Sequence, residues 1–191
     1  MTKLEEKLYP PLNEKFETGE ISQEDLNQVV QNLGIGNICL GYEFKYVPHV
    51  AYTFTIYSKD DKKIEEKVVC ASCVDGNVFY LNHVVQKKPR AVGDLDFAKM
   101  TPGGLSCDDL KDKITEFVQN DFKSRAIQYE ERRKENGLTI IEKKKEFIDE
   151  KYGVLSQPRI VYLPIIKLQG NRGEAILDGV DESTISVVKY E

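Results

Sequence analysis

Two cysteines three positions apart, Cys70 and Cys73, come closest in this sequence to the residue types and spacing of a chemical site. A Cys-x-x-Cys pair is half of a structural zinc site, which needs four tetrahedral ligands and usually takes them from two such pairs. The second pair is missing, and the most suitable single residues are Cys39 and His83. The sequence therefore offers Cys70, Cys73, Cys39 and His83 as a zinc set, as the alternative to having no cofactor.

The residues around this cysteine pair favour a packing role. Val68, Val69 and Val74 surround the pair and are typical of a half-buried strand. Residues three apart on a regular strand point to opposite faces and cannot share a metal ion. We therefore interpret Cys70 and Cys73 as small hydrophobic residues of the core.

A third cysteine, Cys107, follows Ser106, which is a predicted helix cap. The first turn of a helix stabilises a thiolate, as a nucleophile would require. A cysteine nucleophile normally also needs a base, and the two histidines, His49 and His83, fall on separate predicted strands. We therefore assign no catalytic residue, and a cysteine-dependent enzyme remains the alternative.

Composition indicates one folded domain of 191 residues, with 40% hydrophobic and 31% charged residues. The net charge of −5 argues against bulk binding to nucleic acid or to anionic membranes. The first ten residues carry charges throughout, unlike a secretory signal, and no run approaches the roughly 18 apolar residues of a membrane span. These features predict a cytoplasmic protein.

Capping pairs predict where helices begin. Thr2 with Glu5 predicts a first helix that stops near Tyr9, before two prolines. Ser22 with Asp25 predicts a second helix, with an apolar face and Gly34 at its end.

Alternating apolar and polar residues predict strands from residue 37 onward. Runs at 42–46, 52–56, 64–74 and 77–85, with a turn at Asp75-Gly76, predict an antiparallel sheet of about four strands. Three further runs at 159–168, 174–177 and 184–188 predict a C-terminal meander. Segment 46–48 (Tyr-Val-Pro) recurs at 162–164 as Tyr-Leu-Pro, and this can reflect either a duplication or chance.

A third capping pair, Ser106 with Asp109, opens a long tract with apolar residues every three to five positions. We predict that Asn136-Gly137 breaks this tract into a helical hairpin. Two basic clusters flank the break and would form a positive tip, although interleaved glutamates favour a solvated, self-paired surface.

Together these elements predict one α+β domain over 1–191, with helices packed on one face of the sheet. Its parts are N-terminal helices at 1–34, a first β region at 37–86, a helical hairpin at 105–153 and a C-terminal β region at 158–190. The predicted function is a non-catalytic binding or assembly module whose partner is another protein, and a homo-oligomer is compatible with it. The open sheet face and the hairpin tip are the candidate surfaces, with the binding residues Tyr42, Phe44, Tyr46, Arg132, Arg133, Lys143 and Lys144.

Overall fold

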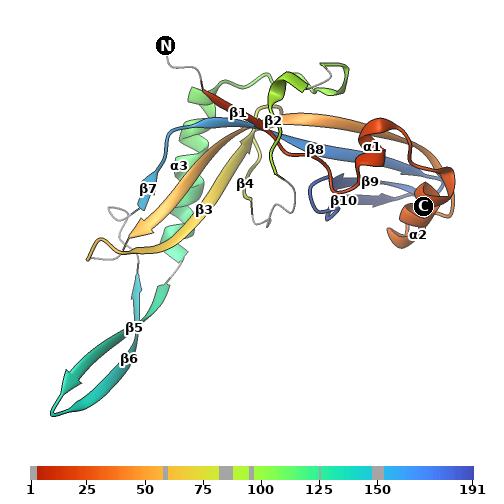
Figure 1. The fold of residues 1–191 in the computed structure, drawn as a ribbon. Coiled ribbons are helices and arrows are strands. Elements are labelled where there is room, and N and C mark those ends of the chain that lie inside the picture. The colour runs from red at the N-terminus through yellow and green to blue at the C-terminus, as the bar shows by residue number, and fades with distance from the viewer. Residues whose placement is uncertain (1–3, 58–59, 82–87, 95–96, 125, 148–152) are drawn as a thin grey trace.

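The computed structural model of the chain describes residues 4–57, 60–81, 88–94, 97–124, 126–147 and 153–191 (Figure 1). The elements follow one another as β1 (Glu5–Leu8), α1 (Glu14–Thr18), α2 (Gln23–Asn32), β2 (Cys39–Tyr57), β3 (Lys63–Ser72), β4 (Val78–Tyr80), the 3₁₀ turns η1 (Val92–Asp94) and η2 (Phe97–Lys99), α3 (Cys107–Ser124), β5 (Ala126–Glu135), β6 (Leu138–Phe147), β7 (Gly153–Leu155), β8 (Arg159–Gly170), β9 (Gly173–Asp178) and β10 (Thr184–Lys189).

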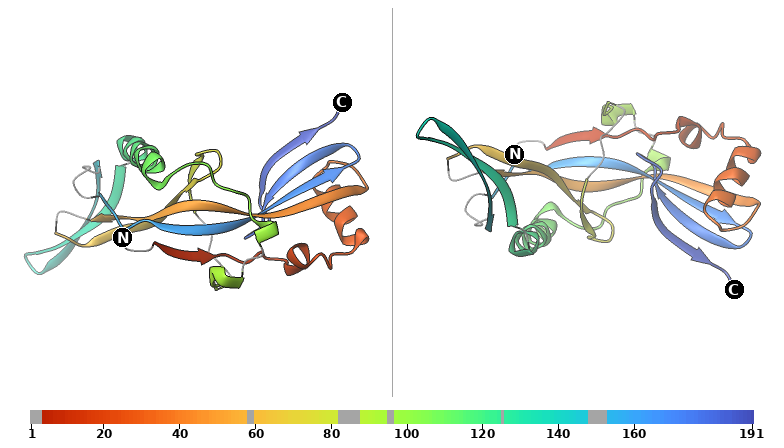
Figure 2. Two further views of the ribbon diagram at one scale, coloured as in Figure 1. Left: turned by 90° about the horizontal axis from the view of Figure 1, so that it is seen from above. Right: turned by 90° about the horizontal axis from the view of Figure 1, so that it is seen from below.

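A mostly antiparallel, twisted sheet forms the body of the protein (Figure 2). Its strand order is β10-β9-β8-β2-β3-β4, with β1 added parallel to β8 and β7 added to β2. The long strands β2 and β8 lie at its centre and pair from Cys39 opposite Gly170 to Ala51 opposite Arg159. The architecture is broadly α+β, and the two predicted β regions lie in this one sheet.

The two Tyr-x-Pro segments lie opposite each other at the centre of the sheet. Val47 pairs with Leu163, and on either side of that pair the tyrosine of each segment faces the proline of the other. The flanking strands are arranged in the same way on both sides. On one side β3 pairs with β2 and β4 pairs with β3, and on the other side β9 pairs with β8 and β10 pairs with β9. A duplicated strand unit would give this approximate two-fold symmetry, and duplication itself stays a hypothesis.

The prolines of these segments are tolerated because they stand where the flanking ladders end. The carbonyl of Pro48 accepts from the N–H of Cys73 (2.9 Å), one residue past β3, and the carbonyl of Pro164 accepts from Gly179 (2.8 Å), one residue past β9. An N–H at either proline would point past the last residue pair of the neighbouring ladder, so the ladder loses no hydrogen bond by having proline there. For this reason β2 continues through Pro48 as one strand, where the sequence predicted two.

Helices cover the two opposite ends of the sheet (Figure 2). The α2 helix packs Leu26 and Val30 against the β2–β8 end, and α3 packs Leu110, Ile114 and Val118 against the β2–β3 end. The predicted packing of all helices as one layer is therefore replaced by two separate clusters. Among the described residues, no helix has both the length and the apolarity that crossing a membrane requires.

The predicted caps of the second and third helices are confirmed. Ser22 Oγ accepts from the N–H of Asp25 (3.1 Å), and Gly34 takes a positive φ of 72° just past the end of α2. Ser106 Oγ accepts from the N–H of Asp109 (3.2 Å), whose carboxylate accepts in return from the Ser106 hydroxyl (2.7 Å).

Two other helix predictions are wrong. The described part of the first segment is strand β1, because the prolines after Tyr9 leave too few residues to nucleate a stable helix. The predicted helical hairpin is helical only as far as Ser124, and its second half is the two-stranded ribbon β5–β6. Asn136 and Gly137 both have positive φ, 52° and 77°, which suits a two-residue hairpin turn rather than a break between helices.

Candidate functional site

The β5–β6 ribbon, residues 126–147, projects from the body of the protein and is called the arm below (Figure 1). Its strands pair over their full length, from Ala126 opposite Phe147 to Glu135 opposite Leu138. In the described part of the chain, β5 and β6 pair with each other and with no strand of the main sheet. The arm therefore extends as a ribbon with both faces uncovered by another sheet.

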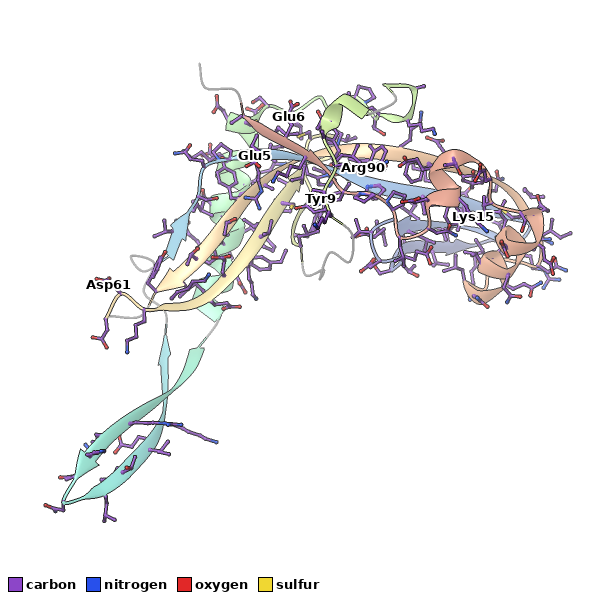
Figure 3. The ribbon with its side chains drawn as sticks, in the orientation of Figure 1. Glu5, Glu6, Tyr9, Lys15, Asp61 and Arg90 are labelled. Carbon is purple, nitrogen blue, oxygen red and sulfur yellow. The ribbon has the colours of Figure 1, made fainter. Side chains whose placement is uncertain are left out.

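The outer half of the arm exposes apolar side chains among charges (Figure 3). Leu138 is 70% exposed and Ile141 is 53% exposed. Cross-strand pairing and alternation put Ile141 on the face that carries Arg132, Lys134 and Lys143. That face of the arm is therefore basic and partly apolar.

The opposite face of the arm is partly neutralised by its own ion pairs. Arg133 lies 3.1 Å from the Glu142 carboxylate and 3.8 Å from that of Glu135. The predicted residues Arg132, Arg133, Lys143 and Lys144 thus share one element, but it is a β ribbon instead of a helical tip.

A second exposed feature lies at the other end of the molecule, where β10 forms an edge of the sheet (Figure 1). All six residues of β10 are exposed, including Ile185 at 56% and Val188 at 57%. The sequence predicts this strand but not its exposure, because the burial of a strand depends on which other elements pack over it.

Exposed carboxylates outnumber basic residues at this end of the molecule, and we call the region formed by α1, α2, β9 and β10 with their turns the acidic end. Its basic residues are Lys15, Arg172 and Lys189. They are outnumbered by exposed acids, which are Glu14, Glu20, Glu24, Asp25, Glu174, Asp181, Glu182 and Glu191.

The aromatic residues predicted to lie on an open sheet face are not available there. Phe44 and Tyr46 are 7% and 2% exposed, and both belong to the core beneath α1 and α2. Tyr42 is half-buried, and its hydroxyl donates to the carbonyl of Phe16 (3.2 Å). The predicted open-face position of these three side chains is therefore wrong, because the N-terminal segment covers them.

A polar cluster that the sequence did not reveal surrounds Tyr46. Arg90 Nη2 donates to both Glu17 carboxylate oxygens (3.0 and 2.8 Å) and lies 2.8 Å from the Tyr46 hydroxyl, which itself donates to Glu17. The backbone of Arg90 exchanges two hydrogen bonds with that of Leu8 (3.0 and 2.7 Å). The cluster therefore joins β1, α1, β2 and the segment around Arg90, which is a structural role.

The three predicted zinc ligands that the structure describes are distributed through the core. Cys39, Cys70 and Cys73 belong to three different clusters of buried residues, and His83 lies outside the described residues. Among the residues that the structure describes, no three His, Cys, Asp or Glu side chains come together as metal ligands would. Burial raises the pKa of Cys70 to about 12, so its thiol stays protonated at neutral pH. The interpretation of Cys70 and Cys73 as core residues is confirmed.

Cys107 begins α3, as predicted, and is partly buried. It packs against the same cluster as Cys73, together with Leu105 and Phe117. His49, one of the two residues considered as its base, bonds instead through Nδ1 to the carbonyl of Val47 (2.8 Å) and packs edge-on against Phe79. The described part of the chain thus shows no base engaged with Cys107.

His49 makes stability depend on pH, because burial lowers its pKa below the ordinary value of 6.5, against smaller opposing effects of the Val47 carbonyl and Asp75. The unfolded chain takes up a proton near that value while the native state does not. We expect the free energy of unfolding to be unaffected by His49 above about pH 6.5, and to fall below it until the lowered native pKa is reached. Urea unfolding between about pH 5 and 8 measures this, and His49→Gln should remove that part of the slope; an unchanged slope would contradict it.

The fold and the site define an elongated α+β protein with a projecting ribbon arm at one end and, at the other, the acidic end with its exposed edge strand β10. Searches against protein-family models, curated protein sequences and solved structures found no match for this chain.

Proposed function

We propose that this chain is a non-catalytic protein-binding or assembly module and that the arm holds its partner. The observation that carries this proposal is the outer half of the arm, where Leu138 and Ile141 are exposed on a ribbon that pairs with no other strand of the described residues. A two-stranded ribbon alone in water is marginally stable, and a partner packed on it supplies the missing layer. Cross-strand pairing puts Leu138 on the face with Arg133 and Ile141 on the face with Arg132, so each face of the outer arm exposes an apolar residue among charges, as interaction surfaces do.

The charge on the arm favours a protein over a nucleic acid as the partner. Six basic residues of segment 126–147 stand against five glutamates, so the arm is nearly neutral overall. The protein as a whole carries −5, and its summed field repels phosphate. A protein surface that offers both apolar contact and carboxylates fits the face with Ile141, Arg132, Lys134 and Lys143.

We place this function in the cytoplasm. None of the four cysteines, all within the described part of the chain, is in a disulfide. Buried thiols such as those of Cys39, Cys70 and Cys73 are compatible with a reducing compartment.

Site-specific photo-crosslinking tests the binding role of the arm. Benzoylphenylalanine in place of Leu138 should give protein adducts when the chain is expressed in its native cells and irradiated. The same group in place of Glu116, an exposed residue of α3, is the matched control. Adducts from position 138 that exceed those from 116 and keep their size after nuclease treatment support the proposal. Equal adducts at both positions, or adducts that nuclease removes, would refute it.

A further inference from the structure

The β10 strand offers an open row of backbone hydrogen-bonding groups. Among the described strands, β9 is its one neighbour, so its outer edge has no strand beside it. The N–H of Tyr190 donates to the carbonyl of Arg172 (2.9 Å), and alternation from there aims the N–H of Val188 at β9 and that of Val187 outward. An exposed apolar edge of this kind is a template for another strand.

The arm and the β10 edge are complementary in charge and chemistry. The outer half of the arm, residues 132–143, has four basic residues against two glutamates, with Leu138 and Ile141 exposed. Within the acidic end, the β10 strand exposes Ile185 and Val188. In β9, β10 and their turns the exposed acids Glu174, Asp181, Glu182 and Glu191 outnumber the basic residues Arg172 and Lys189. Contact between two arms or between two acidic ends brings like charges together, whereas contact between an arm and an acidic end is attractive.

The two surfaces cannot meet within one molecule, because they lie at opposite ends of it (Figure 1). The ten-residue strands of the arm are long enough to pair along the six residues of β10. Extending the proposed function of the arm, we infer that its partner is a second copy of this chain, and that the arm of one copy adds to the β10 edge of the next. Because the two surfaces differ, the contact is head-to-tail and generates rings or open chains.

Two variants that each remove one surface test this inference. Leu138→Asp with Ile141→Asp removes the two exposed large apolar side chains that the structure describes on the arm. Val187→Pro removes an outward N–H of β10 without removing a donor to β9, and Val187→Lys is the second edge variant if the proline variant does not fold. Sedimentation velocity gives the masses, and circular dichroism checks the fold.

We expect wild-type protein to form species larger than the monomer as concentration rises, and each variant alone to lose all of them. An equimolar mixture of the two variants should restore a dimer and nothing larger, because one intact arm then meets one intact edge. This recovery distinguishes a head-to-tail contact from any symmetric one.

Other outcomes overturn the inference. If the arm variant alone still associates, the contact joins edge to edge, and if the edge variant alone still associates, it joins arm to arm. If wild-type protein stays monomeric at its highest soluble concentration, self-assembly is excluded. The proposed binding function is judged separately, because adducts from position 138 to a different protein would preserve it while excluding a second copy as the partner.

Discussion

Gly170→Ala should lower the free energy of unfolding by about 3 kcal/mol, or the melting temperature by about 8 °C. A Cβ at this buried end of β8 would collide with the carbonyl oxygen of Ile35 and lie 3.0 Å from both the carbonyl carbon of Ile35 and Val30 Cγ1. That carbonyl cannot easily move away, because it accepts from the N–H of Arg172 (2.9 Å). Accommodating the methyl group therefore means displacing the segment after α2 from the sheet.

Gly41→Ala is the matched control for this substitution. Gly41 also lies in a central strand, β2, but a Cβ there would meet nothing within 4 Å. Its effect should be within about 0.5 kcal/mol. Urea unfolding of both variants measures the difference, and equal midpoints would show that the approach of Ile35 to β8 is not as tight as the structure has it.

The parts of the fold that depend on neighbours in sequence could be predicted from it. At both caps the hydroxyl of Ser22 or Ser106 accepts from the backbone N–H of the aspartate three residues on, so both partners are visible in the sequence. The Asp75-Gly76 turn is similarly local, and Gly76 takes the positive φ of 73° that such turns require.

The arm shows how a local signal can be outweighed. Asn136-Gly137 is the strongest type of hairpin signal, and β-branched residues at 139–141 support a strand. The charged residues on both sides are good helix formers, and apolar residues there also recur at helical spacing. The basic residues Arg132, Arg133, Lys143 and Lys144 therefore lie on a β ribbon and not on the predicted helical tip.

Features made by distant segments could not be predicted. Whether β10 is covered depends on what packs over it, and nothing in its own six residues distinguishes a buried strand from an exposed one. Likewise Tyr46 is covered by a segment around Phe16, some thirty positions away in the chain. Alternation gives the face of a strand but not what covers that face.

The second large effect is expected at the hydrogen bond between Glu17 of α1 and Tyr46 of β2, which holds the covering segment on the sheet. Glu17→Ala should lower the free energy of unfolding by about 2 kcal/mol, because the Tyr46 hydroxyl, on a side chain only 2% exposed, would lose the carboxylate to which it donates. Burial, and then the Glu17 carboxylate, raise the pKa of Tyr46, so the hydroxyl stays protonated and remains a donor. The lost ion pair with Arg90 contributes less to this destabilisation than a fully buried pair would. The Arg90 side chain is 38% exposed, so water can replace the carboxylate.

Thermodynamic coupling separates this contact from a general effect of changing α1. Tyr46→Phe removes the hydroxyl but keeps the ring in the core, so after it Glu17→Ala should cost about 1 kcal/mol less than in the wild type. Glu20→Ala, an exposed residue just beyond α1, should change stability by less than about 0.5 kcal/mol. Urea unfolding of the single and double variants provides the cycle. If the Glu17 and Tyr46 effects simply add, the hydroxyl and the carboxylate do not interact, and α1 is held to the sheet by the apolar contacts of Phe16 instead.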